Sequence, residues 1–455
     1  MIPSSTQRLS GWGRYPAEDC KVFRPEKRRS VHEILDSGQE PHYIARGLGR
    51  SYGDTAVNGG GGVLSTVRLN RMLSFDETSG TLECEAGVSL AEILEAFLPR
   101  GWFLPVTPGT KFVTVGGAIA NDVHGKNHHR DGTFGAHVLE LALLTPGGEV
   151  IVCSPESRAD FFWATVGGIG LTGIILTAKI RLQRVESAYM KVDYYRLKNI
   201  QETLDTIRET DARYQYSVAW VDCLARGGAL GRSVLMLGQH AAPNELRPGT
   251  GDPFDARARK KPGVPFDFPR FALNPLSIRA FNGAFYAMHP SRDGKIIDYD
   301  SYFYPLDAVN NWNRIYGKRG FTQYQATFPT GKEDGLVQLL ERLSAASCAS
   351  FLAVLKRFGP EGKGLLSYPF EGYTLTLDIP MREGLLAFLS DCDRLVLQYG
   401  GRLYLAKDMC MNADSFAAMY PRVGEFRKVR RELDPKGVLS SRMARRLRLA
   451  EDTTS

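Results

Sequence analysis

Three glycine-rich segments within the first 175 residues are suited to bind a large anionic ligand. The first is Arg46-Gly-Leu-Gly-Arg-Ser-Tyr-Gly-Asp54, the second covers residues 107–125, and the third covers residues 163–173. Glycine permits unusual backbone angles and leaves amide N–H groups accessible to anions. Any one segment can be an ordinary tight turn, but the three together indicate a backbone that approaches a dinucleotide closely.

The first segment does not fit the nicotinamide-binding Rossmann fingerprint. After Gly47-Leu-Gly49 the next glycine is Gly53 rather than a glycine three positions on, and the chain continues into Asn58-Gly-Gly-Gly-Gly62, which predicts no helix. A nicotinamide site of this type is therefore not expected.

No metal site is predicted. Three histidines, His124, His128 and His129, lie at the end of the second segment and just after it. The adjacent pair points in different directions, and no carboxylate spacing accompanies it. The seven cysteines are scattered without a CxxC pair, which argues against structural zinc and against a disulfide framework and favours a reducing compartment.

The elements that must position the glycine segments can be read from the apolar pattern. A strand from Tyr43 enters the first segment, and Ser89 with Glu92 forms a capping box for a helix after a strand over 81–86. Strands over 139–145 and 149–153 form a predicted hairpin, and another strand covers 174–180. Residues 336–343 have helical apolar spacing, whereas 240–277, rich in Pro, Gly, Arg and Lys, predicts a mobile loop.

Two further strands carry polar side chains on one face. Gln323 and Gln325 are two residues apart, as are Thr374, Thr376 and Asp378 on another strand. A polar sheet face can simply be solvated, so this pattern alone does not define a site.

Composition is that of a globular protein. The 455 residues are 43% hydrophobic, which allows two or three folding units, and the net charge of +7 is a mild excess suited to phosphates or an anionic membrane surface. Nucleic acid would need a denser basic stripe, so we expect no nucleic-acid partner. The N-terminal residues lack a signal-peptide pattern, and no apolar run is long enough to cross a bilayer. We expect a cytoplasmic protein or a peripheral one at the inner membrane, with a periplasmic location left open.

The motifs resemble a known flavoprotein family. Four segments are similar to the FAD-binding (PCMH-type) half of the vanillyl-alcohol oxidase superfamily. They are the first glycine segment, Pro108-Gly-Thr, Asp122-Val-His-Gly-Lys-Asn-His-His129 and Val166-Gly-Gly-Ile-Gly-Leu-Thr-Gly173. Within this superfamily, the chain most resembles the decaprenylphosphoryl-ribose 2′-oxidases, which are the flavin subunits of an epimerase. This resemblance rests on the same segments together with Gly400-Gly-Arg-Leu-Tyr-Leu-Ala-Lys-Asp408 and residues 434–447. The resemblance spans nearly the whole chain and is weakest from about 188 to 300.

The resemblance implies an α+β fold of two domains. The FAD-binding domain would cover 1–187, a substrate domain with an antiparallel sheet flanked by helices would cover 188–401, and 402–455 would return to the first domain. It also implies an FAD shell made of Ala45, Arg46, Gly47, Leu48, Gly49, Arg50, Ser51, Tyr52, Gly53, Asp54, Thr55, Gly109, Thr114, Val115, Gly116, Gly117, Asn121, Asp122, Val123, His124, Ile175 and Tyr404. Arg50 stands where many members carry the histidine that tethers the flavin, so we expect non-covalent FAD.

The same resemblance implies the chemistry. Lys407 and Tyr52 would be the catalytic pair, because a flavin that oxidises an alcohol needs a base near the hydroxyl and a positive charge near the reduced ring. Gln323, Gln325, Lys356, Thr376 and Lys407 would line the sugar-phosphate pocket, with Lys356 suited to the phosphodiester. The mycobacterial members carry a cysteine at the position of Thr376, so inhibition through a thiol should fail here.

Three activities are compared. The first is oxidation of the 2′-hydroxyl of a polyprenylphosphoryl-ribose to a 2′-keto sugar, which a separate NAD(P)H-dependent reductase would convert to the arabinose donor for cell-envelope glycans. The second is an oxygen-using oxidase of free sugars, alditols or aldonolactones, although the His-Trp pair of aldonolactone oxidases does not occur in the chain. The third is a scaffold that binds FAD without turnover, which the presence of Tyr52 and Lys407 disfavours.

Overall fold

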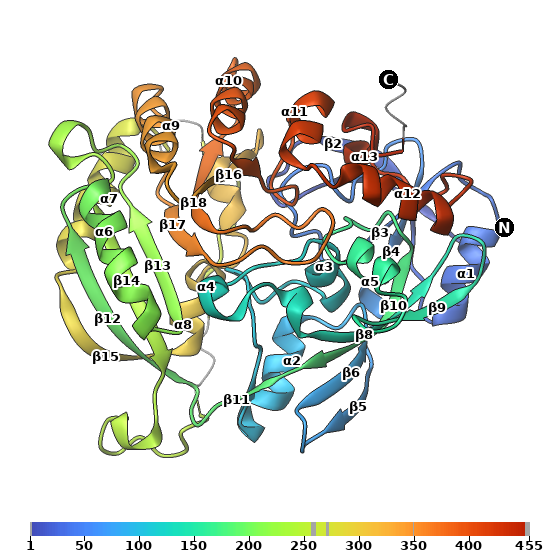
Figure 1. Cartoon of the computed structure of the whole chain (residues 1–455), viewed down its shortest axis with the longest axis horizontal. Helices are drawn as coiled ribbons and strands as arrows, with labels where there is room; N and C mark the ends of the chain where they lie inside the picture. The colour runs from blue at the N-terminus through green and yellow to red at the C-terminus, as the bar shows by residue number, and fades with distance from the viewer. Residues whose placement is uncertain (1, 256–260, 270–272, 349, 451–455) are drawn as a thin grey trace.

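The computed structural model describes residues 2–255, 261–269, 273–348 and 350–450. The chain forms a four-stranded sheet, a five-stranded sheet, an eight-stranded sheet and a two-stranded ribbon within these ranges, together with helices (Figure 1). The sheets are mostly antiparallel, and the predicted α+β class is confirmed.

The four-stranded sheet holds the first glycine segment. Its order is β1 (Ser5–Ser10), β2 (Ala17–Phe23), β4 (Gly62–Ser65) and β3 (Tyr43–Arg46), with helix α1 (Arg28–Asp36) between β2 and β3. Strand β4 runs parallel to both of its neighbours, β2 and β3, and the first glycine segment leaves the sheet at the end of the edge strand β3. It is a turn without a helix, as predicted.

The five-stranded sheet supports the second and third glycine segments. Its order is β5 (Met72–Asp76), β6 (Thr81–Glu85), β10 (Ile174–Arg181), β8 (Val138–Leu144) and β9 (Val150–Cys153). The predicted hairpin is β8 with β9, and the predicted capping box begins helix α2 (Leu90–Phe97). The helices α3 (Val115–Ala120), α4 (His128–Asp131) and α5 (Ala159–Thr165) follow along the chain, and β7 (Trp102–Phe103) pairs with β11 (Gln183–Arg184).

The eight-stranded sheet is antiparallel throughout. Its order is β15 (Arg292–Asp298), β12 (Tyr189–Leu197), β14 (Ser233–His240), β13 (Tyr216–Val221), β17 (Ala353–Phe358), β18 (Gly372–Pro380), β16 (Phe321–Pro329) and β19 (Arg402–Leu403). Helices α6 (Ile200–Thr210), α9 (Glu333–Ala345) and α10 (Leu385–Gln398) contact these strands. Leu355, Leu375 and Leu377 are fully buried in the core, while their neighbours in sequence point to the opposite face.

Helices α7 (Pro275–Met288) and α8 (Tyr299–Phe303) belong to the segment between β14 and β16. The mobile loop predicted over 240–277 includes residues 256–260 and 270–272, which lie outside the described residues; its described part contains a short 3-10 turn at 243–245 and the start of α7.

The C-terminal segment packs against the N-terminal half. Helices α11 (Ala413–Met419), α12 (Val423–Leu433) and α13 (Arg442–Arg446) are drawn in dark red in Figure 1. Helix α11 contacts α10, and helix α12 contacts α5 of the N-terminal half. The backbone of Tyr43 exchanges hydrogen bonds with Val438 and Ser440. Strand β19 joins the eight-stranded sheet just past residue 401, so the division at 187 and 401 stays a proposal. No helix of the described residues is both long and apolar enough to span a membrane.

Candidate active site

A cavity of about 820 Å³ lies where the first glycine segment, α3 and one face of the eight-stranded sheet meet. This volume is in the range of small-molecule and cofactor sites. Of the predicted residues, the cavity is lined by Ala45, Arg46, Gly47, Leu48, Gly49, Arg50, Ser51, Tyr52, Thr55, Gly109, Thr114, Gly116, Gly117, Asn121, Val123, His124, Ile175, Gln323, Gln325, Lys356, Thr376, Tyr404 and Lys407. The structure thus brings together residues from both ends of the chain.

The glycines of the first segment are required by close packing. A Cβ atom at Gly47 would lie 2.2 Å from Oγ1 of Thr114, and Gly49 has a φ of +65°, the left-handed region that favours glycine. The guanidinium of Arg46 donates to the carbonyl oxygens of Ser10 (2.7 Å) and Ala56 (3.0 Å), and these two hydrogen bonds hold the start of the segment in place. The backbone is therefore open toward the cavity and rigid behind it.

Three buried polar atoms of cavity-lining residues have no hydrogen-bond partner among the described residues. They are Nε of Arg50, Oδ1 of Asn121 and Nδ1 of His124. Buried polar groups are nearly always paired, so unpaired donors and acceptors beside a cavity fit a polar ligand. The glycine segment and these atoms together suit a flavin dinucleotide, with the unpaired groups available to its ring and phosphates.

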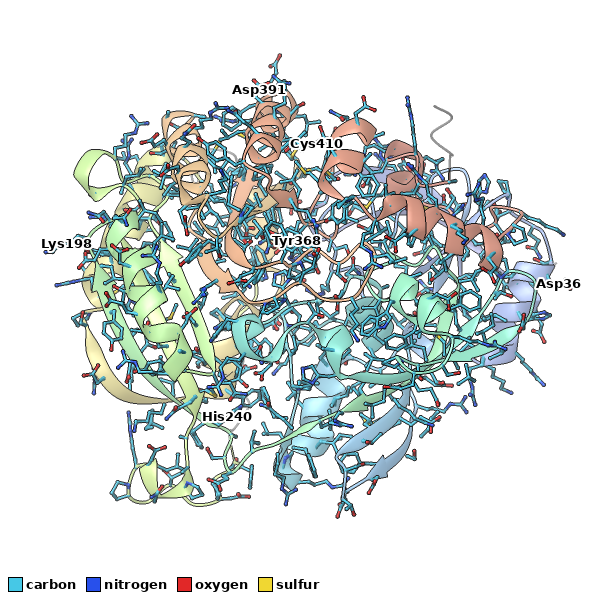
Figure 2. All side chains as sticks on the ribbon, in the orientation of Figure 1. Asp36, Lys198, His240, Tyr368, Asp391 and Cys410 are labelled. Carbon is cyan, nitrogen blue, oxygen red and sulfur yellow. The ribbon has the colours of Figure 1, made fainter. Side chains whose placement is uncertain are left out.

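His124 is held neutral. Gln325 Nε2 donates to its Nε2 (3.0 Å), and burial together with the charges of Lys356 and Lys407 holds the pKa of His124 well below its usual value. The ring proton therefore lies on Nδ1 and is available to a ligand. Its imidazole contacts Tyr368 and Tyr404 at centroid distances of 5.6 and 5.0 Å, and Figure 2 shows Tyr368 in the middle of the molecule.

One face of the eight-stranded sheet supplies the polar floor of the cavity. Gln325 on β16 pairs with Thr376 on β18, and Thr376 pairs with Val354 on β17. Because residues two apart share a face, Gln323 and Lys356 also point into the cavity. The predicted one-sided arrangement of Gln323, Gln325 and Thr376 matches the strands, and the face is covered rather than solvated.

Lys407 is one of the lining side chains whose pKa is strongly altered. Burial lowers its pKa to about 7, the charge of Asp378 opposes this shift, and the charge of Lys356 adds to it. Its Nζ lies 3.9 Å from the ring centroid of Tyr52, a cation–π distance. A lysine with a pKa near neutrality can accept a proton under physiological conditions.

Tyr52 has the opposite property. Burial raises the pKa of its hydroxyl well above 10, and Gln323 Nε2 donates to that oxygen (3.2 Å). The same amide group donates to Oδ1 of Asp378 (2.5 Å), whose pKa burial raises to about 7. Tyr52 is thus a phenol that stays protonated and can donate to an oxygen, while Lys407 is the group able to take a proton.

The cavity is positively charged. Lys126 and Lys356 line it with Arg46, Arg50 and Lys407, and no Asp or Glu among the described residues lines it. Burial, with the charge of Lys356, lowers the pKa of Lys126 to about 7, and burial lowers that of Lys356 to about 8. Amines held in this way are stabilised in their charged form by an anion, so the cavity favours phosphate-bearing ligands.

Four residues predicted for the FAD shell do not line the cavity. A Cβ at Gly53 would meet the carbonyl oxygen of Asp408 at 1.9 Å, so this glycine serves packing. Asp54 is fully buried and accepts two hydrogen bonds from Arg446 (2.8 and 3.0 Å). Val115 is in the core, and Asp122 accepts from Gly135 N (2.9 Å) and Ser367 Oγ (2.5 Å). These four support the residues that do line the cavity.

Many lining residues were missed by sequence reasoning, and three of them show why. The ring of Trp12 stacks under Arg50, with Cζ 3.9 Å from the centroid, and its flanking glycines Gly11 and Gly13 were a signal. Lys126 follows His124 by two residues within a motif already recognised. Trp220 on β13 also lines the cavity, and nothing in the sequence marked it.

Comparisons with known proteins indicate a flavoprotein. A family model described as an FAD binding domain matches residues 21–154, and one described as D-arabinono-1,4-lactone oxidase matches residues 373–447. The chain is similar to the decaprenylphosphoryl-β-D-ribose oxidase of Mycolicibacterium smegmatis, with 41% identity over 98% of this chain and 99% of that protein. It is also similar to the L-gulonolactone oxidase of Bos taurus, with 28% identity over 44% of this chain and 46% of that one.

Proposed function

The chain belongs to the decaprenylphosphoryl-β-D-ribose oxidase family, and from this premise we propose that it oxidises the 2′-hydroxyl of a polyprenylphosphoryl-β-D-ribose to a 2′-keto sugar. It is an FAD-dependent oxidoreductase. The single observation that supports this reaction best is Lys407, an amine with a pKa lowered to about 7 that lies against Tyr52 in a cation-lined cavity.

The side chains divide the work of the reaction. Oxidation of an alcohol removes a hydride from the carbon and a proton from the hydroxyl oxygen, leaving a carbonyl. When bound, FAD supplies the hydride acceptor. Neutral Lys407 takes the hydroxyl proton at Nζ, and the positive charge it gains then lies in the cavity where negative charge accumulates. Protonated Tyr52 donates to a sugar oxygen and orients it.

Substrate positioning follows from the polar floor. Gln323 and Gln325 present amides to sugar hydroxyls, and Lys356 stands beside them with a charge suited to the phosphodiester. The rings of His124, Tyr368 and Tyr404 contact one another and form an aromatic cluster, which keeps water from the reacting carbon. The proposed FAD is non-covalent, because Arg50 is not a nucleophile that forms a flavin tether.

The 2′-keto product requires a partner reaction. Inversion at C2′ needs a hydride returned to the opposite face, so a separate NAD(P)H-dependent reductase is part of the proposal, and the product of the pair would be the arabinose donor. A peripheral contact with the inner membrane is proposed as well, because the substrate is lipid-linked.

A second candidate is an oxygen-using oxidase of free sugars or aldonolactones. It is favoured by the match of residues 373–447 to the D-arabinono-1,4-lactone oxidase model. That match covers strand β18 and the segment with Lys407, which the two reactions would share.

Anaerobic flavin reduction separates the two candidates. The holoenzyme is mixed with polyprenylphosphoryl-ribose, free ribose, arabinitol or an aldonolactone, and bleaching of the flavin absorbance is followed. We expect bleaching by the lipid-linked ribose alone. Bleaching by an aldonolactone, with none by the lipid-linked ribose, would overturn the proposal in favour of the second candidate.

A further inference from the structure

The sheet face that forms the polar floor becomes apolar toward the other edge of the sheet. Trp220 on β13 pairs with Val354 on β17, and Val218 on β13 pairs with Met236 on β14, which in turn pairs with Tyr194 on β12. All five of these side chains line the same cavity as Lys356 and Gln325. The cavity therefore has an apolar arm that extends across three successive strands beyond Lys356.

The apolar arm is roofed by helix α7. Its inward side lines the cavity, and Phe285 contacts Trp220 with ring centroids 4.5 Å apart. Asn282 is fully buried and donates to Oδ1 of Asp222 (2.8 Å), which anchors the helix to the end of β13. The arm is thus defined by two walls, which are Tyr194, Val218, Trp220 and Met236 on the sheet and Ile278 and Phe285 on the helix.

Helix α7 crosses the arm along its length. Phe281 contacts Phe351, just before β17, with ring centroids 6.0 Å apart, whereas His289, just after the helix, stacks on Tyr194 of β12 at 5.9 Å. Phe281 lines the cavity and is 46% exposed, so the roof opens to solvent near the Lys356 end of the arm. Strands in a sheet are about 4.8 Å apart, so a ligand in the arm can extend about 14 Å from β17 to β12 beneath the helix.

The chemistry across the sheet follows the covalent order of a lipid-linked sugar. The groups suited to a sugar, Gln323 and Gln325, lie on β16, and the cation suited to a phosphate, Lys356, lies two strands away on β17. The apolar residues come next, on β13, β14 and β12. A sugar, a phosphate and an apolar chain are joined in that same order, and a branched hydrocarbon needs no hydrogen bonds from the walls of the arm.

We propose that the apolar arm binds the first isoprenoid units of the substrate's lipid tail, which would lead from Lys356 beneath α7 toward Tyr194 on β12. This assignment rests on the proposed function and adds a second point of recognition to it. The sugar and phosphate fix the reacting carbon, and the arm selects for a hydrocarbon attached to the phosphate. Substrates that share the headgroup but lack the tail should bind more weakly and react at a similar maximal rate.

Chain length tests the assignment. Anaerobic flavin reduction is measured with methylphosphoryl-β-D-ribose and with geranylgeranylphosphoryl-β-D-ribose in the same detergent, and the half-saturating concentration is separated from the limiting rate. Each buried methylene strengthens binding by about fourfold, so the long substrate should half-saturate at a concentration at least about tenfold lower. The limiting rates should agree.

A blocked arm should remove this advantage. Val218→Phe places a larger side chain between Lys356 and Met236, and we expect it to abolish the preference for the long chain while the methyl substrate reacts as in the wild type. Val152→Phe is the matched control, because Val152 is 52% exposed on β9, away from the cavity. Met236→Gln keeps nearly the same volume, and it should reduce the preference even if the larger substitution prevents folding.

The outcomes distinguish the two levels of the proposal. A wild-type enzyme reduced equally well by both substrates refutes the tail assignment alone, as does a long-chain preference that survives in both arm variants. Loss of reactivity toward both substrates in a folded Met236→Gln variant also refutes it, because the residue would then serve the headgroup. A wild-type flavin that neither substrate reduces refutes the proposed function itself.

Discussion

Replacing the charges around Lys407 should move the pH dependence of flavin reduction in two opposite directions. The negative charge of Asp378 raises the pKa of Lys407, and the positive charge of Lys356 lowers it. Asp378→Asn therefore removes the influence that keeps Lys407 protonated, and Lys356→Met removes one that deprotonates it. If neutral Lys407 is the base, the rate rises with pH through the pKa of this amine.

The magnitude follows from a pKa of about 7. The neutral fraction of Lys407 is then about a tenth at pH 6 and about nine-tenths at pH 8, so the wild-type rate should rise about tenfold over that interval. Loss of a nearby opposite charge shifts a pKa by on the order of one unit. In the Asp378→Asn variant the rise in rate should therefore be centred near pH 6, where about half of the amine is already neutral. In the Lys356→Met variant the rise should be centred above pH 7.

The assay is anaerobic stopped-flow reduction at low substrate concentration, because the second-order constant reports the pKa values of the free holoenzyme. Lys356→Met is expected to lower the second-order rate constant at every pH, because phosphate binding is weaker. The comparison therefore uses the pH at which the rate constant rises and not its absolute value. In Lys407→Met the rate constant should fall about 10²–10⁴-fold and should show no rise with pH over this interval. Lys407 would be refuted as the base if the pH at which the rate constant rises shifted in the same direction in Asp378→Asn and Lys356→Met, or if it stayed unchanged in both variants.

Three further outcomes are expected. Acid precipitation should leave a colourless pellet and a yellow supernatant, because Arg50 cannot tether the flavin; colour in the pellet would contradict this. Thiol reagents should leave flavin reduction unchanged in the wild type and inhibit Thr376→Cys, since no cysteine of the described residues lines the cavity; equal sensitivity of both proteins would count against the geometry. Arg446→Met should lower the free energy of unfolding by about 3 kcal/mol, because the buried carboxylate of Asp54 then keeps only its longer ion pair with Arg442 (3.6 Å). In the same urea titration, breaking the exposed ion pair of Arg394 with Asp391 should cost at most about 1 kcal/mol.

Local patterns in the sequence predicted the elements that carry the site. The capping box of Ser89 and Glu92 begins a helix as expected, because both of its hydrogen bonds involve residues three positions apart. Gln323 and Gln325 share a sheet face because side chains alternate along any strand. These features depend on near neighbours in the chain, and near neighbours are what a single sequence displays.

Features that depend on tertiary contacts were not predictable in this way. The family resemblance predicted that Asp54, the last residue of the first glycine segment, belongs to the cofactor shell, yet its partner is Arg446, almost four hundred residues further along the chain. Trp220 belongs to β13, which pairs with β17, and Met236 belongs to β14, which pairs with β13. This strand order sets their places relative to Lys356, whereas their own sequence context is that of ordinary core strands. The apolar arm therefore became visible only when strand order and register were known.

The ion pairs of Arg446 with Asp54 and Asp408 have a consequence for biosynthesis. Asp54 ends the glycine segment and Asp408 follows Lys407, so one guanidinium joins the two segments that enclose the cavity. A ribosome makes Asp54 long before Arg446, which follows it by almost four hundred residues. The nascent protein cannot assemble this junction until Arg446 has been made, and we therefore expect flavin to be taken up only after the segment that carries Arg446 has left the ribosome.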